Sequence, residues 1–98
     1  MLLHIALQEG FTKDTVLIRC DGREIYRKAG VSTRTQTGYA DSVQLDMHAN
    51  SLKITIELPQ KRLSKTIDIA ISDPTYIGIS VTAGQVTHRI SREPFGYL

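Results

Sequence analysis

The side chains best suited to catalysis or metal binding in this sequence are a single cysteine and three histidines. They are Cys20, His4, His48 and His88, and none has the close spacing of a metal-binding pair or a cysteine cluster. A nucleophilic cysteine needs a neighbouring base and a lowered thiol pKa, and the sequence offers no helix terminus near Cys20 to lower it. We therefore interpret Cys20 as a small buried residue, and we expect no catalytic residue, no metal ligand and no cofactor.

The acidic residues and serines form no recognisable catalytic set either. The ten acids are scattered singly, no serine lies in a G-x-S-x-G turn, and no glycine-rich loop leads into a helix that would bind phosphate. Calcium at a loop end beside Asp21, Asp41 or Asp73 stays open, although the dense ligand spacing of an EF-hand is missing. A small metal-dependent enzyme is accordingly an alternative hypothesis and not the favoured one.

Composition and net charge narrow the range of partners. Twelve basic and ten acidic residues give a formal charge of +2, and acids interrupt the basic residues throughout, which does not favour a phosphate-binding surface. No apolar run reaches the roughly 18 residues of a membrane span, and a lone cysteine is typical of the cytoplasm. We expect one domain over residues 1–98, located in the cytoplasm, that binds neither nucleic acid nor membrane.

Apolar and polar residues alternate with a period of two, which is typical of strands with one buried and one solvated face. The clearest run is Leu52–Leu58, and similar runs elsewhere bring the number of expected strands to about eight. No stretch keeps a helical period. The sequence predicts an all-β fold, an antiparallel two-layer β-sandwich of seven to eight short strands, rich in hairpins and without significant helix.

Four turn sequences predict the hairpins, because a short loop fixes which residues of its two strands face each other. In every one of these registers apolar residues meet apolar residues, and a slip by one position would expose them all. The expected pairs are Ile18 with Ile25 across loop 21–22, Leu45 with Ile54 across loop 49–50, Ile54 with Ile67 across loop 59–62, and Ile77 with Ile90 across loop 83–84.

The inward positions of the strands predict the hydrophobic core. We expect burial of twelve side chains, namely Ile18, Ile25, Val43, Leu45, Leu52, Ile54, Ile56, Ile67, Ile69, Ile79, Val81 and Ile90.

The segment from Ala29 to Asp41 departs from the alternating pattern. It is polar, contains two glycines, and separates two expected hairpins, so it is either an edge strand or a loop with a function. Arg34, Gln36 and Tyr39 are its candidate binding residues, Tyr39 because an aromatic ring fills contact area at a small entropic cost. If the segment is an edge strand, its free backbone groups can pair with another chain.

These observations favour a small non-catalytic binding or assembly module over an enzyme. It would act through a strand edge or the 29–41 segment, and its partner would be another protein or a second copy of itself. A carbohydrate-binding module is the alternative, with Tyr39 as a stacking ring beside Arg34, Gln36 or Asp41.

Overall fold

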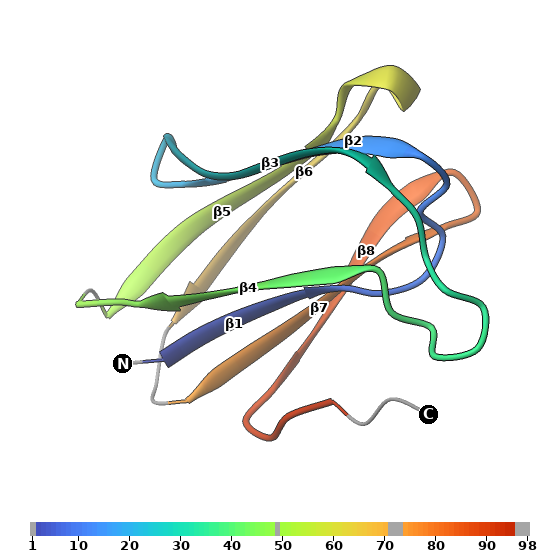
Figure 1. Ribbon diagram of the computed structural model, residues 1–98. Helices are drawn as coiled ribbons and strands as arrows, with labels where there is room; N and C mark the ends of the chain where they lie inside the picture. The colour runs from blue at the N-terminus through green and yellow to red at the C-terminus, as the bar shows by residue number, and fades with distance from the viewer. Residues whose placement is uncertain (1, 49, 71–73, 96–98) are drawn as a thin grey trace.

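The computed structural model describes residues 2–48, 50–70 and 74–95. Its all-β sandwich confirms the expected fold class (Figure 1). The strands are β1 (Leu2–Leu7), β2 (Asp14–Cys20), β3 (Arg23–Val31), β4 (Asp41–Asp46), β5 (Ser51–Leu58), β6 (Leu63–Ala70), β7 (Thr75–Thr82) and β8 (Gln85–Ser91). One short 3-10 turn, η1 (Pro59–Lys61), joins β5 to β6. None of the helices found in these three ranges is long and apolar enough to pass through a bilayer.

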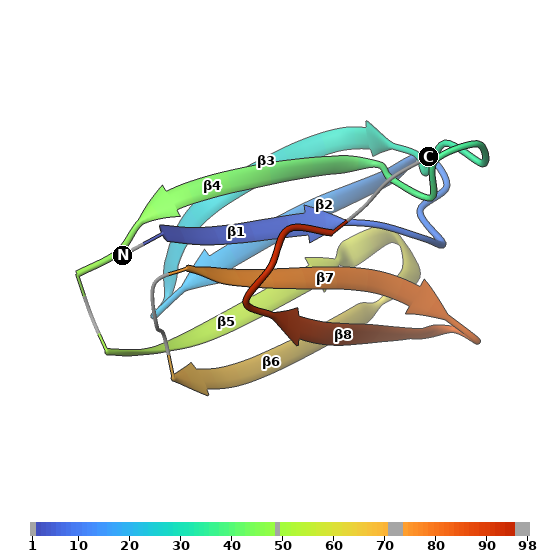
Figure 2. The ribbon, with the colours of Figure 1, turned by 90° about the horizontal axis from the view of Figure 1, so that it is seen from below.

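Two four-stranded sheets pack face to face, in the orders β4-β1-β7-β8 and β3-β2-β5-β6. Figure 2 shows how the strands of the two layers stack, with β4 over β3, β1 over β2, β7 over β5 and β8 over β6. Each large apolar side chain buried between the sheets stabilises the fold by about 1.5–3 kcal/mol. The largest fully buried apolar residues are Leu3, Ile5, Leu7, Val16, Ile18, Ile54, Ile56, Leu58, Ile77 and Ile79.

Two of the expected hairpins have the predicted register throughout. Ile54 lies opposite Ile67 in the β5–β6 pair, and Ile77 lies opposite Ile90 in the β7–β8 pair. The turn of the second hairpin places Ala83 and Gly84 at φ values of 53° and 74°. Positive φ at both central residues gives the twist that a two-residue hairpin needs.

The expected hairpin between β4 and β5 is wrong. β4 pairs with β1 in one sheet, whereas β5 pairs with β2 and β6 in the other, so the connection after β4 crosses between the layers. Leu45 and Ile54 therefore belong to facing sheets and are not neighbours within one sheet. Both arrangements keep the same residues facing the core, so the alternating pattern alone could not distinguish the hairpin from the crossing. Ala49 itself lies outside the described residues.

The β2–β3 hairpin is confirmed at its turn and shifted further along. Cys20 lies opposite Arg23 as expected, but Ile18 lies opposite Tyr26, because a bulge gives β3 one extra residue there. The extra residue is Ile25, which lies between the paired residues Glu24 and Tyr26. A bulge leaves its extra residue unpaired and bends its strand, so Ile25 is only partly buried against the core, where the sequence predicted burial.

The pairing of β1 with β7 is parallel, which differs from the expected all-antiparallel arrangement. Ile5 lies beside Ile77 in this pair, although the two residues are far apart in the sequence. Such a pair has no turn between its strands. The sequence pattern therefore carried no signal for it.

The core prediction is confirmed for most of its members and wrong for one. Ile90 is 52% exposed, because it lies on β8, an edge strand with a neighbouring strand, β7, on one side only. His88, on the same face of β8, is also exposed. The buried members are Ile18, Leu52, Ile54, Ile56, Ile67, Ile69 and Ile79, and those only partly buried are Ile25, Val43, Leu45 and Val81.

Candidate functional site

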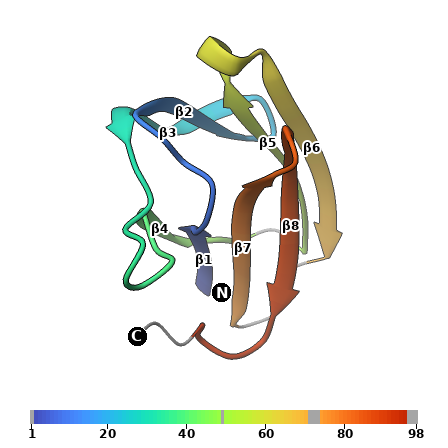
Figure 3. The same cartoon turned by 90° about the vertical axis from the view of Figure 1, so that its right-hand side faces the viewer.

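One end of the sandwich is built from long connections that hold one another. They are the β1–β2 loop (8–13), the β3–β4 loop (32–40) and η1 with its flanks, and we call them together the closed end. Figure 3 views this end and shows the β1–β2 loop crossing from one sheet to the other between the remaining loops. The 29–41 segment is thus partly strand and partly loop: residues 29–31 complete β3, and residues 32–40 are a loop of the closed end.

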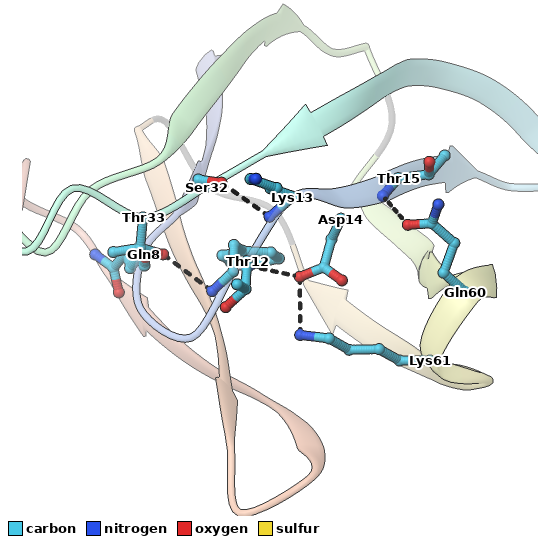
Figure 4. Close-up of polar contacts among 10 residues, drawn as sticks. Gln8, Thr12, Lys13, Asp14, Thr15, Ser32, Thr33, Gln60 and Lys61 are labelled. Carbon is cyan, nitrogen blue, oxygen red and sulfur yellow. Dashed lines mark hydrogen bonds and ion pairs between the residues drawn. The ribbon is translucent and has the colours of Figure 1, made fainter.

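A buried carboxylate fixes the base of the β1–β2 loop. Asp14 is 2% exposed, and its Oδ2 accepts hydrogen bonds from the Thr12 backbone N–H at 2.8 Å and the Lys61 ammonium at 2.9 Å (Figure 4). Next to it, the Gln60 Oε1 accepts a hydrogen bond from the Thr15 N–H at 3.1 Å. A buried charge is costly unless it is paired, so this pair attaches η1 to the start of β2.

The side chains of Ser32 and Thr33 attach the two long loops to each other. The Thr33 Oγ1 accepts a hydrogen bond from the Phe11 N–H at 3.0 Å and donates one to the Gln8 carbonyl at 2.6 Å. The Ser32 Oγ accepts a hydrogen bond from the Lys13 N–H at 2.8 Å (Figure 4). Hydrogen bonds that satisfy backbone groups outside the sheets restrain a loop that would otherwise be mobile.

Phe11 closes the core beneath these loops. Its side chain is 3% exposed and belongs to the core cluster, although it comes from a connection and not from a strand. Gly10 permits the approach, because it adopts a φ of 88° and a Cβ there would collide with the Val81 carbonyl. A shallow cleft of about 530 Å³ remains between the two loops, lined by Phe11, Thr33 and Thr35 among others.

The 32–40 loop folds on itself and presents its tip to solvent. The Arg34 N–H donates to the Tyr39 carbonyl at 3.0 Å, and the Gly38 N–H donates to the Arg34 carbonyl at 2.8 Å. Outside this turn, the Thr33 N–H bonds to the Phe11 carbonyl. Five of its backbone N–H groups, those of residues 33, 34, 37, 38 and 40, are therefore already bonded within the chain.

The three candidate binding residues lie in this one loop but differ in exposure. Arg34 and Gln36 are exposed at the tip, whereas Tyr39 is partly buried at the neck and its hydroxyl lies 3.0 Å from the Ser42 Oγ. The structure thus exposes Arg34 and Gln36 in one loop, whereas Tyr39 contacts Ser42 at the start of β4.

Asp41 faces the neighbouring sheet. Its Oδ2 accepts hydrogen bonds from the Tyr26 hydroxyl at 2.7 Å and the Lys28 ammonium at 3.2 Å. Partial burial acts to raise the pKa of the Asp41 carboxyl, but hydrogen bonds from Tyr26, the Ser42 N–H and Lys28 outweigh it, so the pKa is lowered. Burial and the Asp41 charge raise the pKa of Tyr26. Asp41 therefore joins β3 to β4 and is engaged away from the loop tip.

The cysteine and the histidines lie in separate places. Burial, together with the Asp21 charge, raises the pKa of the Cys20 thiol to about 11, so it is protonated at neutral pH. His4 lies against Tyr76 with ring centroids 5.6 Å apart, and burial lowers its pKa. In the part of the chain that the structure describes, no three His, Cys, Asp or Glu side chains are grouped as metal ligands. Asp73 lies outside the described residues.

Two supporting residues of the closed end escaped the sequence analysis. Phe11 left a signal, because it interrupts a polar stretch with a large aromatic ring. Asp14 left none, because its side chain bonds backward to the Thr12 N–H, which is the reverse of an Asx turn. The Gln8 side chain is likewise buried, and its Oε1 accepts a hydrogen bond from the Arg89 Nε at 3.3 Å. The guanidinium of Arg89 in turn lies over the Phe95 ring at 4.4 Å.

The sequence matches no protein-family model, and comparison with curated proteins and with solved structures finds no match.

Proposed function

We propose that this protein is a non-catalytic binding module that recognises another protein through the tip of the 32–40 loop. The observation that carries the proposal is the contrast within that loop: its backbone is bonded internally, whereas the Arg34 and Gln36 side chains are exposed. A loop held in one conformation loses little entropy when it binds, which favours affinity from a small contact surface. We place this activity in the cytoplasm.

The bonded backbone determines how the loop would bind. Addition of a strand at residues 33–38 would have to break the existing bonds of Arg34 and Gly38, so recognition falls to side chains. Arg34 supplies a cation with several hydrogen-bond donors, and Gln36 supplies both a donor and an acceptor. Tyr39 keeps the neck of the loop in place through its partly buried ring.

Strand addition remains available at β8, which is an edge of its sheet. Ile90 is the exposed large apolar residue on this strand, at 52% exposure. A second copy of the chain could pair with this edge, with Ile90 contributing apolar contact. The β8 edge is thus a second surface through which the protein could bind a partner, in this case another copy of itself.

Site-specific photocrosslinking in cells tests the loop proposal. A photoreactive residue replaces Gln36 in the full chain, and the control carries it at Lys53, an exposed position on β5. We expect crosslinked products from position 36 and not from position 53, and the substitution Arg34→Glu in the same chain should reduce them. A crosslinked product of about twice 10.9 kDa identifies a second copy of the chain as the partner. A crosslinked product of any other mass identifies a different protein. Equal products from both positions, or none from either, would refute the proposal.

A further inference from the structure

The opposite end of the sandwich is open. It lies between the β2–β3 turn and the segment after β4, at the left of Figure 1, whereas the 32–40 loop lies at the right. A cleft of about 720 Å³ occupies this open end, which we define by its lining residues. They are Cys20, Asp21, Arg23, Glu24, Ile25, Leu45, Asp46, Met47, His48 and Leu52.

The inner part of the cleft is apolar. Cys20 and Leu52 form its floor at 6% and 3% exposure, and both belong to the core cluster. Ile25, Leu45 and Met47 line it and are only partly buried. The β3 bulge contributes directly, because it leaves Ile25 unpaired beside the cleft. Clefts of about 300–1,000 Å³ with apolar linings are the usual sites for small organic ligands.

The charged residues at the rim differ in what they already bind. The Asp21 Oδ1 accepts a hydrogen bond from the Lys53 N–H at 2.9 Å, and Glu24 forms an ion pair with Arg27 at 2.7 Å. Asp46 is also engaged. The Arg23 guanidinium, in contrast, has no hydrogen bond or ion pair with the residues that the structure describes, which leaves one uncommitted cation beside an apolar cleft.

We propose that the open end binds a small apolar carboxylic acid, with the hydrocarbon part between Ile25, Leu45 and Met47 and the carboxylate on Arg23. Burial of the hydrocarbon supplies the affinity, because each CH₂ removed from water contributes favourably, and the arginine fork selects a carboxylate head. The inference is independent of the loop proposal, since the two surfaces lie at opposite ends of the sandwich.

Cys20 makes the site measurable in the unmodified protein. It is the sole cysteine of the chain and lies on the floor of the cleft, so an occupant would shield its sulfur from an alkylating reagent. Burial raises the pKa of this thiol to about 11, with a further contribution from the Asp21 charge, so all rates must be compared at one fixed pH.

The experiment measures alkylation of Cys20 by iodoacetamide while sodium decanoate is titrated below its micelle-forming concentration. Decylamine is the probe of opposite charge. Arg23→Gln removes the proposed carboxylate ligand. Arg62→Gln is the matched control, because it removes the same charge from an exposed arginine beside η1 at the closed end, away from the cleft. Circular dichroism of each variant verifies that it is folded.

We expect decanoate to slow alkylation saturably in the unmodified protein, and Arg23→Gln to weaken that protection about five-fold, the upper range for an exposed ion pair. Arg62→Gln should leave it within about two-fold. Absence of protection by decanoate in the unmodified protein would overturn the site. Equal protection by decylamine, or equal loss in both variants, would overturn the assignment of the carboxylate to Arg23.

Discussion

The two ends of this sandwich share one hydrophobic core but differ in how they are closed. At the closed end, Phe11 and Asp14 are 3% and 2% exposed and the loops bond to one another. At the open end, Ile25, Leu45 and Met47 are only partly buried. The connections explain the difference: residues 8–13 and 32–40 join strands at the closed end, whereas residues 21–22 and 47–50 do so at the open end. Short connections have too few residues to fold back over the end of a sandwich.

In this sandwich, the residues that stabilise the fold can differ from those that we propose for recognition. At the closed end, polar side chains such as those of Asp14, Ser32 and Thr33 bond to the loop backbone, whereas Arg34 and Gln36 stay exposed at the loop tip. The open end leaves partly exposed apolar side chains beside Arg23, a cation that has no hydrogen bond or ion pair among residues 2–48, 50–70 and 74–95. Substitutions at the two ends should therefore differ in which property they change.

The largest expected effect is the loss of the Phe11 ring. Phe11→Ala should lower the free energy of unfolding by about 3–5 kcal/mol, because it removes buried apolar surface and leaves a cavity under both loops. Met47→Ala at the open end should cost only about 1 kcal/mol, since its side chain is already partly solvated. Urea unfolding of both variants measures the difference. Similar costs at the two positions would abolish the distinction between the ends.

The Asp14–Lys61 pair should give the next largest effect. Lys61→Met leaves a carboxylate buried without its cation, and we expect a loss of about 2 kcal/mol, less than for a fully buried pair because Lys61 is 36% exposed. Lys53→Met, at an exposed lysine on β5, is the control and should change stability by less than about 0.5 kcal/mol. Thermal unfolding of the two variants side by side tests this, and equal melting temperatures would show that the pair is not stabilising.

Low pH should weaken the hydrogen bonds by which Asp41 links β4 to β3. Because its folded-state pKa is lowered, the Asp41 carboxylate stabilises the fold fully above the unfolded value of 3.8, and this contribution disappears as pH falls through the still lower folded-state pKa. Asp41→Asn should therefore reduce the difference in unfolding free energy between pH 6 and pH 3. Asp68→Asn, at an exposed position on β6, is the control. Denaturant titrations at both pH values measure the change, and an unaltered pH dependence in Asp41→Asn would contradict it.

The smallest effect on stability should come from the loop tip. The double substitution Arg34→Ala and Gln36→Ala removes exposed side chains and should change the free energy of unfolding by no more than about 0.5 kcal/mol. Differential scanning calorimetry measures it. A loss comparable to that of Phe11→Ala would mean that these side chains support the fold and are not reserved for a partner.

The sequence carried enough information for the local pairings and too little for the global ones. The β5–β6 and β7–β8 registers followed from turn chemistry and alternation, because each hairpin is contiguous in the chain. The placement of β4 beside β1 depends on which sheet a strand joins after a turn, and both choices bury the same side chains. The bulge that displaces Ile25 likewise arises from sheet twist and packing, which leave no mark in the alternating pattern.

The loop that carries the candidate residues was foreseeable, but the contacts that support it were not. The polar, glycine-containing segment 29–41 predicted an edge strand or a loop, and Arg34 and Gln36 are exposed in the loop of residues 32–40. Their role in binding stays a prediction. The sequence did not show that Thr33 holds this loop or that the loop closes over Phe11. Both features depend on which strands meet at that end. The cleft at the open end depends on the same knowledge, because its lining comes from both sheets.

The parallel pair of β1 and β7 has a consequence for how the chain reaches its native state. The sheet containing β2, β3, β5 and β6 draws only on residues 14–70, whereas the other sheet stays incomplete until β1 meets a strand that starts at Thr75. Pairings of such long sequence separation carry a large loop-closure entropy and slow the search. We expect Ile5→Val mainly to accelerate unfolding, because β1 joins its sheet late. Ile54→Val should accelerate unfolding and also slow refolding. Stopped-flow kinetics of the two variants measures both rates. On a ribosome, β1 would emerge well before β7 and would wait for that strand before its sheet could be completed.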